Sequence, residues 1–163
     1  MNTPDVSAAS EHEQFMRRCI ELAGIAQMRN NTPVGSVVVI DGEIMGEGIE
    51  DLSAGSSITG HAEVLACQEA VNQTGSKLLD GASLYTTAEP CFMCSYVIRQ
   101  CGISLVVYGV ETPEIGGVTS SHPVLTDTCF SNWMPPPRVL GGILQSECLQ
   151  LTAGKVRHRS AEA

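Results

Sequence analysis

Residues 34–40 form a continuous run of small and β-branched side chains, and this run constrains the fold more than any other segment. A strand of this composition is buried on both of its faces, so its sheet must be covered on both sides. The dipeptide Asp41-Gly42 that follows is typical of a tight hairpin turn, and residues 43–49 then predict the returning strand. The sequence therefore predicts a sheet that lies between two layers of helices.

The rest of the chain is expected to supply the helices of those layers and the further strands of the sheet. Ser10 and Glu13 have the spacing of a capping box, which predicts that the first helix begins at Glu11. Further helices and strands follow from hydrophobic periodicity and from the position of Pro and Gly. The expected helices are 11–28, 61–72, 91–100 and 143–151, and the further expected strands are 82–87, 103–110 and 138–140.

The element order predicts one α/β domain, a layered α/β/α unit. Its central mixed sheet should have about five strands with helices on both faces. We expect a flexible arm at 1–10, a catalytic domain at 11–153 and a tail at 154–163. Residues 111–137 contain Gly116-Gly117 and three consecutive prolines, and an irregular segment of that length is typical of a lid or binding loop.

Charge and hydropathy restrict the partners. No apolar run reaches the length of a membrane span, and residues 1–10 lack the features of a signal peptide, so the cytoplasm and no membrane partner are expected. The net charge is −9, and the basic cluster at 155–159 is interpreted as a solvated terminus. This acidity argues against nucleic acid and favours a small-molecule substrate.

Two short motifs carry the candidate chemistry. His61-Ala62-Glu63 and Pro90-Cys91-Phe92-Met93-Cys94 each stand at the start of an expected helix. Cys91 and Cys94 share a helix face, and a helix N-terminus favours thiolates, so one metal ion can reach both sulfurs. With His61 they provide three ligands, and three protein ligands that leave a position for water are typical of catalytic zinc. We predict one Zn²⁺ per chain.

Glu63 is the candidate proton carrier. It lies two residues from His61, so it is close to the metal without being needed as a ligand. A carboxylate in that place can take a proton from water and deliver it to a ring nitrogen and a departing amine. The pairing of the two motifs is typical of zinc nucleobase deaminases.

Other interpretations of the cysteines remain open. A CxxC pair also occurs as a thioredoxin-like redox centre, although two strands and two helices precede it here. A closed structural zinc site needs a fourth ligand, for which His12, His122 and Cys129 are available. A protein of that kind binds zinc for structure or for a partner, without catalysis.

From about Phe15 to Leu151 the chain resembles the cytidine-deaminase superfamily, in the branch of cytosine deaminases, guanine deaminases and bacterial tRNA adenosine deaminases. Beyond the zinc motifs, the resemblance lies in three segments, 32–35, 84–89 and 141–144. It implies that His61, Cys91 and Cys94 hold zinc and that Glu63 shuttles protons. It also implies that the N–H groups around Ala62 and Cys91 lie near the substrate, and that the protein is a homodimer.

Two positions depart from the family pattern. Where the family often has an Asn that binds the base, eleven residues before the zinc His, this chain has Glu50. A carboxylate only accepts hydrogen bonds, so Glu50 would prefer a base edge rich in N–H groups, unless a shifted loop leaves it in solvent. The prolines at 135–137 replace a polar, basic stretch of the tRNA deaminases. Asn31 and Trp133, the latter with Phe130, are further candidates for substrate contact.

These observations predict a zinc-dependent hydrolytic deaminase of nucleobase metabolism. The expected substrate is a free base of the guanine or cytosine type, deaminated with release of ammonia. Two alternatives are kept: a tRNA-specific adenosine deaminase, and a non-catalytic zinc protein.

Overall fold

Four helices and five strands follow one another in the predicted order in the computed structural model, which describes residues 6–52 and 57–153. The elements are α1 (Val6–Met28), β1 (Gly35–Ile40), β2 (Glu43–Ile49), α2 (Ala62–Thr74), β3 (Ser83–Ala88), α3 (Phe92–Gln100), β4 (Leu105–Val110), β5 (Arg138–Gly141) and α4 (Gln145–Ala153). The predicted irregular segment 111–137 connects β4 to β5.

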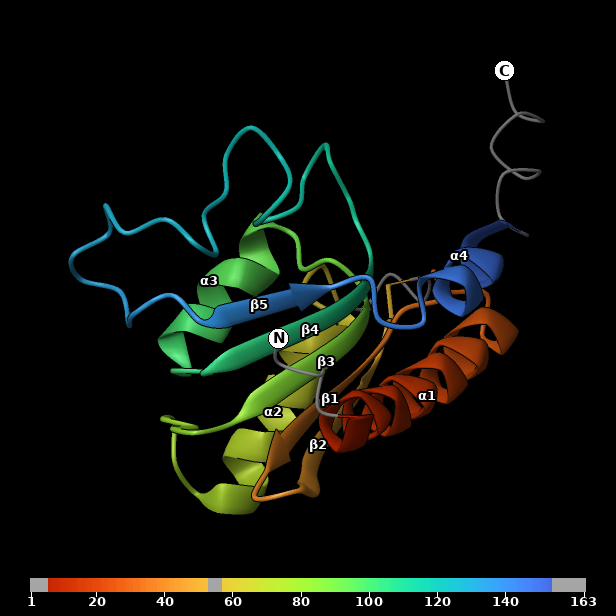
Figure 1. The fold of residues 1–163 in the computed structure, drawn as a ribbon, viewed down its shortest axis with the longest axis horizontal. Helices are drawn as coiled ribbons and strands as arrows, with labels where there is room; N and C mark the ends of the chain where they lie inside the picture. Colours follow the sequence, from red (N-terminus) through yellow and green to blue (C-terminus); the bar gives the residue numbers. More distant parts are fainter. Residues whose placement is uncertain (1–5, 53–56, 154–163) are drawn as a thin grey trace.

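The five strands form one mixed sheet in the order β2-β1-β3-β4-β5 (Figure 1). β1 pairs antiparallel with both β2 and β3, whereas β3, β4 and β5 run parallel. At the β1–β2 hairpin, Asp41 and Gly42 both adopt positive φ angles, 52° and 79°, as a tight two-residue turn requires. The predicted mixed sheet of about five strands is confirmed.

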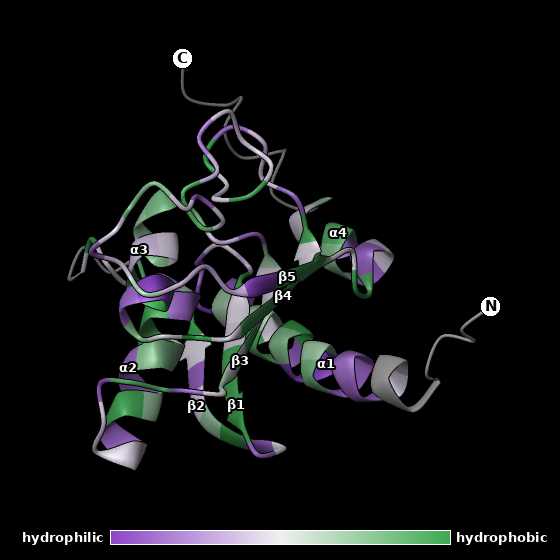
Figure 2. Cartoon of the chain, turned by 60° about the vertical axis from the view of Figure 1, so that its left-hand side comes forward, coloured by the Kyte–Doolittle hydropathy of each residue, from purple (hydrophilic) through white to green (hydrophobic). Residues whose placement is uncertain are grey.

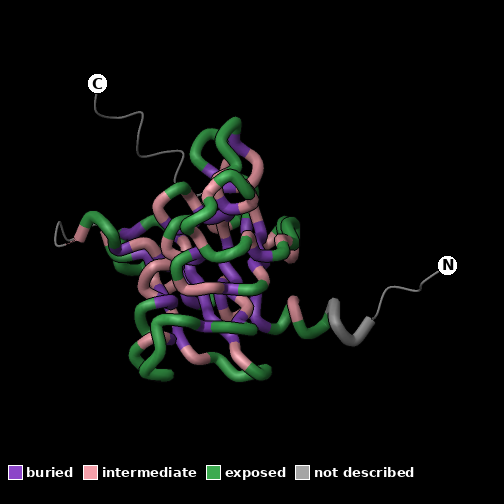
Figure 3. The backbone as a smooth tube through the Cα atoms, turned by 90° about the vertical axis from the view of Figure 1, so that its left-hand side faces the viewer, coloured by how far each residue is buried: buried purple, intermediate pink, exposed green. Residues whose placement is uncertain are grey.

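Helices cover both faces of this sheet, as the run at 34–40 requires. Along β1, Val38 contributes to a core with α2 and α3, whereas Val37 and Val39 contribute to a second core with α1 and α4. β3 alternates in the same way, with Leu84 on the first face and Tyr85 on the second. Figure 2 shows the apolar strands β1 and β4 between the two helical layers, and Figure 3 shows the buried residues gathered at the centre of the molecule.

The first helix starts earlier than predicted. α1 begins at Val6, so Ser10 and Glu13 lie inside the helix and do not cap it. Residues 8 and 9 are alanines, the strongest helix formers, and they allow the helix to continue past the expected cap. The expected arm, apart from residues 6–10, and the expected tail lie outside the described residues. Within the described ranges, no helix combines the length and apolarity that crossing a bilayer requires.

α2 packs directly against the backbone of β2, and this contact fixes where α2 begins. A Cβ added to Gly46 would lie 2.2 Å from the carbonyl oxygen of Ala66. A Cβ added to Gly48 would lie 1.8 Å from the carbonyl oxygen of Ala62, the first residue of α2. The two glycines therefore let the helix lie closer to the strand than any side chain would permit.

We expect Gly48→Ala to lower the free energy of unfolding by about 3 kcal/mol, because backbone atoms on both sides must move to admit the methyl group. Urea denaturation measures this change. Gly24→Ala in α1 is the matched control, since nothing lies within 4 Å of the added Cβ. That change should be neutral or stabilise the protein by up to about 1 kcal/mol. Equal effects at the two positions would contradict the close packing of α2 on β2.

Candidate active site

The starts of α2 and α3 bring the two motifs together. His61 immediately precedes α2 and Cys91 immediately precedes α3, and both have extended backbone conformations. Cys94 lies in the first turn of α3, and its side chain is fully buried. The three predicted ligands therefore come from two helix N-termini on the same face of the sheet.

The ligand atoms have the spacing of a tetrahedral zinc site. His61 Nδ1 lies 3.7 Å from Cys91 Sγ and 3.5 Å from Cys94 Sγ, and the two sulfurs are 3.6 Å apart. Zinc at its usual distances from sulfur and nitrogen, in tetrahedral geometry, separates its ligand atoms by about 3.5–3.8 Å. The donor set and its dimensions therefore fit one Zn²⁺, as predicted.

The pKa values of Cys91, Cys94 and His61 are shifted by the hydrogen bonds that the three side chains make with one another. Hydrogen bonds from Cys94 and His61 lower the pKa of Cys91 to about 4, so Cys91 is a thiolate at neutral pH. The neighbouring thiolate and burial raise the pKa of Cys94. The hydrogen bond with Cys91 raises the pKa of His61 to about 9. Metal binding to this group therefore releases protons, as is usual for thiolate and imidazole ligands.

None of the three residues considered as a fourth ligand lies at this site. His12 Nδ1 is hydrogen-bonded to the hydroxyl of Tyr85, which belongs to the core on the opposite face of the sheet. His122 Nδ1 contacts the hydroxyl of Ser121, and Cys129 is exposed. Within the described ranges, the only metal-binding group of three that contains cysteine is His61, Cys91 and Cys94. These positions contradict the closed sites built from those three residues.

Glu63 lies where the sequence predicts it, beside the ligands. Its side chain is buried, and Oε2 lies 3.4 Å from Cys94 Sγ. Carboxylate oxygens of Glu63 and Glu50 and a ring nitrogen of His61 all lie within 4.8 Å of one another. Burial raises the pKa of Glu63 to about 7. A carboxylate in this place can exchange protons with any molecule held at the metal.

Glu50 is also part of the site and does not lie in solvent. It is buried, and its Oε2 accepts a hydrogen bond of 3.2 Å from the backbone N–H of Ala62. The interpretation in which a loop shift exposes Glu50 is therefore wrong. Asn31, also buried, donates to Asp51 Oδ1 and accepts from the N–H of Leu52. These two hydrogen bonds hold the segment that follows Glu50.

Trp133 packs between its own segment and α3. Its ring stacks on Phe130 at 4.3 Å between centroids and meets the edge of Tyr96 at 5.0 Å. The guanidinium of Arg99 lies 5.1 Å from the same ring. These contacts join the 111–137 segment to α3, and none of them involves the predicted zinc ligands. The proposed stacking of Trp133 on a substrate stays a prediction.

Arg99 is the residue that the sequence analysis missed. It is 1% exposed, and it donates hydrogen bonds to the carbonyl oxygens of Val124, Asp127 and Met134. A buried guanidinium therefore fixes the second half of the 111–137 segment. The one signal in the sequence is an arginine next to the buried Ile98 in an otherwise apolar stretch of α3.

We expect Arg99→Met to lower the free energy of unfolding by about 2–4 kcal/mol, because three carbonyl groups lose their donor. Urea denaturation measures the loss, and hydrogen exchange should accelerate between residues 122 and 135. Arg138→Met removes an exposed cation at the end of the same segment and should change stability by no more than about 0.5 kcal/mol. Unchanged exchange in Arg99→Met would refute the anchoring role.

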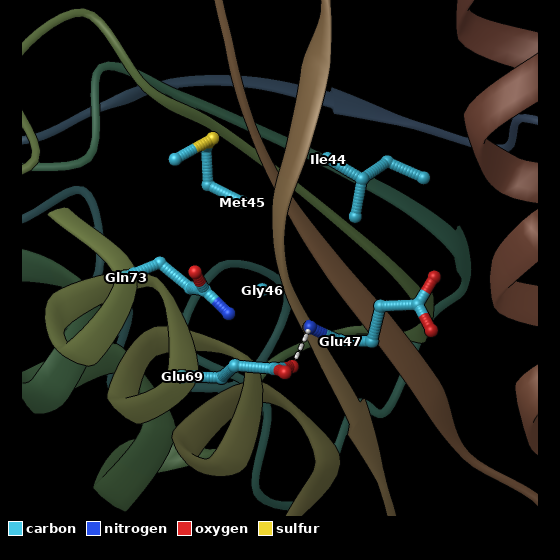
Figure 4. A pocket seen from close by; sticks show the side chains of 6 residues that line it. All are labelled: Ile44, Met45, Gly46, Glu47, Glu69 and Gln73. Atoms are coloured by element: carbon cyan, nitrogen blue, oxygen red, sulfur yellow. Dashed lines mark hydrogen bonds between the residues drawn. The ribbon is translucent and has the colours of Figure 1, made fainter.

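A separate pocket of about 330 Å³ lies between β2 and the end of α2 (Figure 4). Its lining residues are Ile44, Met45, Gly46, Glu47, Glu69 and Gln73. Glu69 accepts a hydrogen bond from the N–H of Glu47, so it covers part of this edge strand. Gln73 lies three turns along α2 from its start, roughly 16 Å away. The pocket is therefore distinct from the predicted zinc site.

Several known proteins with similar sequences and structures are named as deaminases. The tRNA-specific adenosine deaminase of Streptococcus pyogenes serotype M1 is 33% identical over 141 residues, which cover 86% of this chain and 81% of the relative. A structure from a study of A-to-I editing by tRNA:A34 deaminases matches with a TM-score of 0.79 and 30% identity, covering 85% of this chain and 98% of that one. The guanine deaminase of Bacillus subtilis matches with a TM-score of 0.59 and 37% identity, covering 61% and 64%.

These relatives overturn the expectation that nucleic acid is an unlikely partner and that the substrate is a free base. That expectation rested on a net charge of −9. Relatives that span most of this chain are named for their action on tRNA. The physical error is that a net charge sums over the whole surface, whereas binding of a nucleic acid depends on where individual charges lie. The basic cluster at 155–159 lies outside the described residues.

A family model that matches the region of both motifs establishes the family of the chain. The model of the cytidine and deoxycytidylate deaminase zinc-binding region matches residues 9–110, which contain both motifs. That range runs from α1 to the end of β4 and includes every atom of the three-ligand group. The chain belongs to the cytidine and deoxycytidylate deaminase family and is a zinc-dependent hydrolytic deaminase.

Proposed function

We propose that the protein is a tRNA-specific adenosine deaminase, with His61, Cys91 and Cys94 as zinc ligands and Glu63 as the proton shuttle. The observation that carries the proposal is the buried Glu63 carboxylate next to a His/Cys/Cys group of zinc dimensions. The similarity to tRNA adenosine deaminases over 86% of the chain supports the choice of substrate.

The residues of the site have separate tasks in this proposal. Zinc, when bound, supplies a Lewis acid that activates water near neutral pH. Glu63 takes a proton from the attacking water and delivers protons to N1 of adenine and to the departing amine. The water oxygen bonds to C6, its second proton passes through Glu63 to the amine, the bond from C6 to the amino nitrogen breaks, and the products are inosine and ammonia. The buried wall of the site keeps Glu63 away from bulk solvent.

Glu50 contributes to substrate binding through its position. Its carboxylate accepts a hydrogen bond from the N–H of Ala62 and lies within 4.8 Å of the Glu63 carboxylate and of a ring nitrogen of the zinc ligand His61. Because an ionised carboxylate only accepts hydrogen bonds, it is suited to the exocyclic N–H groups of the base. Glu50→Gln should therefore alter KM more than it alters zinc content.

The proposed substrate is tested with an anticodon stem-loop that carries adenosine at the wobble position. Zinc-loaded protein should convert this adenosine to inosine, measured by nuclease digestion and chromatography, with equal release of ammonia. The matched control is the same stem-loop with guanosine at that position. Release of ammonia from guanine or cytosine, without conversion of the stem-loop, would overturn the proposal.

The dimer that the family resemblance implies is proposed for the same protein. Phe92 and Tyr96 are 38% and 48% exposed, and both lie on α3, the helix that carries Cys94. Burying such a surface against a second copy removes apolar area from water. Sedimentation equilibrium tests this, and a monomer at micromolar concentration would contradict it.

A further inference from the structure

Glu89 lies between β3 and α3, and the zinc chemistry does not require it as a ligand. The side chain of Glu89 is only 2% exposed. It precedes Pro90 and Cys91, so it stands at the point where the chain leaves the sheet for the metal group. A buried carboxylate is stable only where hydrogen bonds or charges compensate it.

Both oxygens of this carboxylate are occupied by the 111–137 segment. Oε1 accepts hydrogen bonds from the backbone N–H groups of Val118 and Thr119, each at 2.8 Å. Oε2 accepts from the backbone N–H of Thr112 at 2.9 Å and from the hydroxyl of Thr119. Residues 112–119 therefore fold around Glu89, and we call them the collar.

The collar also contacts the two residues that follow Glu89. The N–H of Gly117 donates to the carbonyl oxygen of Pro90 at 2.9 Å, and Gly116 forms an antiparallel bridge with Cys91. A Cβ on Gly116 would lie 2.2 Å from Glu89 Oε1, so the collar lies against the carboxylate without a gap. Glu89, Pro90 and Cys91 are thus held by a single piece of chain.

Cys91 needs such support more than Cys94 does. Cys94 lies inside α3, where the helical hydrogen bonds fix its backbone. Cys91 precedes the first helical residue, and its side chain caps no helical N–H. Its carbonyl accepts the N–H of Ser95, and the further restraint on its backbone comes from the collar and from Pro90.

We propose that Glu89 is a positioning residue that sets the place of the zinc ligand Cys91 by holding the collar. The inference rests on the ligand assignment in the proposed function, but it does not depend on which substrate is deaminated. A residue of this kind acts on the metal through its neighbours, and loss of such outer contacts typically weakens metal binding 10–100-fold.

Glu89→Gln is a sharp test, because it preserves the size of the side chain and replaces one hydrogen-bond acceptor oxygen by an NH₂ donor. Each oxygen accepts from at least one backbone N–H, and a backbone N–H cannot become an acceptor. An amide NH₂ on either side therefore faces a donor. We expect zinc affinity of Glu89→Gln, measured by chelator competition from the zinc-loaded protein, to fall about 10–100-fold.

Thr119→Val is the milder companion variant. It keeps the shape of the side chain and removes only the hydroxyl donor to Oε2. The loss of zinc affinity should have the same direction and be smaller. Cobalt(II) substitution gives a second reading in both variants, since the sulfur-to-cobalt absorption reports the cysteine ligands directly. We expect the intensity of this absorption to fall slightly in Thr119→Val and further in Glu89→Gln.

Leu79→Ala separates positioning from general stability. Leu79 is buried in the core that also contains Cys94, and its N–H donates a hydrogen bond to the carbonyl oxygen of Cys101 at the far end of α3. It should lower the melting temperature while zinc affinity and the cobalt spectrum stay at their normal values. If Glu89→Gln matches Leu79→Ala in all three readings, the positioning role is overturned. If Glu89→Gln does not fold, Thr119→Val with normal zinc affinity overturns it equally.

The test also stands apart from the choice of substrate. Zinc affinity and cobalt absorption are measured without any RNA. A protein that fails to deaminate the stem-loop, but loses zinc affinity in Glu89→Gln, would refute the proposed substrate and support the role of Glu89. The reverse pattern would refute the role of Glu89 alone.

Discussion

Glu63→Gln is expected to slow ammonia release by about 10⁴-fold, the upper end of what general acid–base catalysis contributes, because one carboxylate serves several proton transfers. The change keeps the size of the side chain and removes its charge. Glu63 is buried beside Cys94 Sγ but is not needed to complete the three-ligand group, so zinc should remain at about one per chain. The measurement is single-turnover ammonia release with zinc content determined on the same sample.

Glu69→Gln is the matched control for this experiment. Glu69 lies on the same helix but is exposed, and it bonds to the edge strand β2. Its replacement should leave turnover within about two-fold, since it is remote from the reacting groups. Near-normal turnover in Glu63→Gln would remove Glu63 from the mechanism. Loss of zinc in Glu63→Gln would instead make Glu63 a ligand.

Cys94→Ala is expected to reduce bound zinc from about one ion per chain to less than about a tenth. Cys94 supplies one corner of the three-atom group and lies 3.5 Å from His61 Nδ1. Because the metal joins the starts of α2 and α3, its loss should also lower the free energy of unfolding by roughly 2–5 kcal/mol. Metal analysis after gel filtration and urea denaturation measure the two effects.

Cys148→Ala distinguishes the loss of a ligand from the loss of a buried thiol. Cys148 is 1% exposed and belongs to the core with α1, on the other face of the sheet. It should lose some stability and retain all of its zinc. Full zinc occupancy in Cys94→Ala would show that the metal is held elsewhere.

The sequence predicted the parts of the fold that depend on local pattern. The apolar run at 34–40 required a sheet covered on both sides, and Val37 and Val38 indeed belong to opposite cores. The spacing of Cys91 and Cys94 placed both thiols on one helix face, because the period of a helix is fixed. The position of the three zinc ligands could thus be predicted from the starts of α2 and α3.

Contacts between distant segments could not be predicted in this way. Arg99 reaches the carbonyl groups of residues 124, 127 and 134, and nothing in its own neighbourhood indicates these partners. Glu89 precedes Pro90 in the chain, whereas the four donors that its carboxylate accepts from all belong to residues 112–119. The acidic net charge misled for a related reason, since a sum over residues contains no positions.

The glycines of β2 limit which insertions, deletions and substitutions this strand can accept. Gly46 and Gly48 are two residues apart, so both face α2, and a strand has a side-chain period of two. Inserting or deleting one codon between residues 43 and 46 would turn other side chains toward the helix. Edge strands often tolerate such length changes, but here the helix that begins beside His61 would be displaced. We therefore expect this outer strand to accept substitutions at its solvent-facing positions and to reject insertions and deletions.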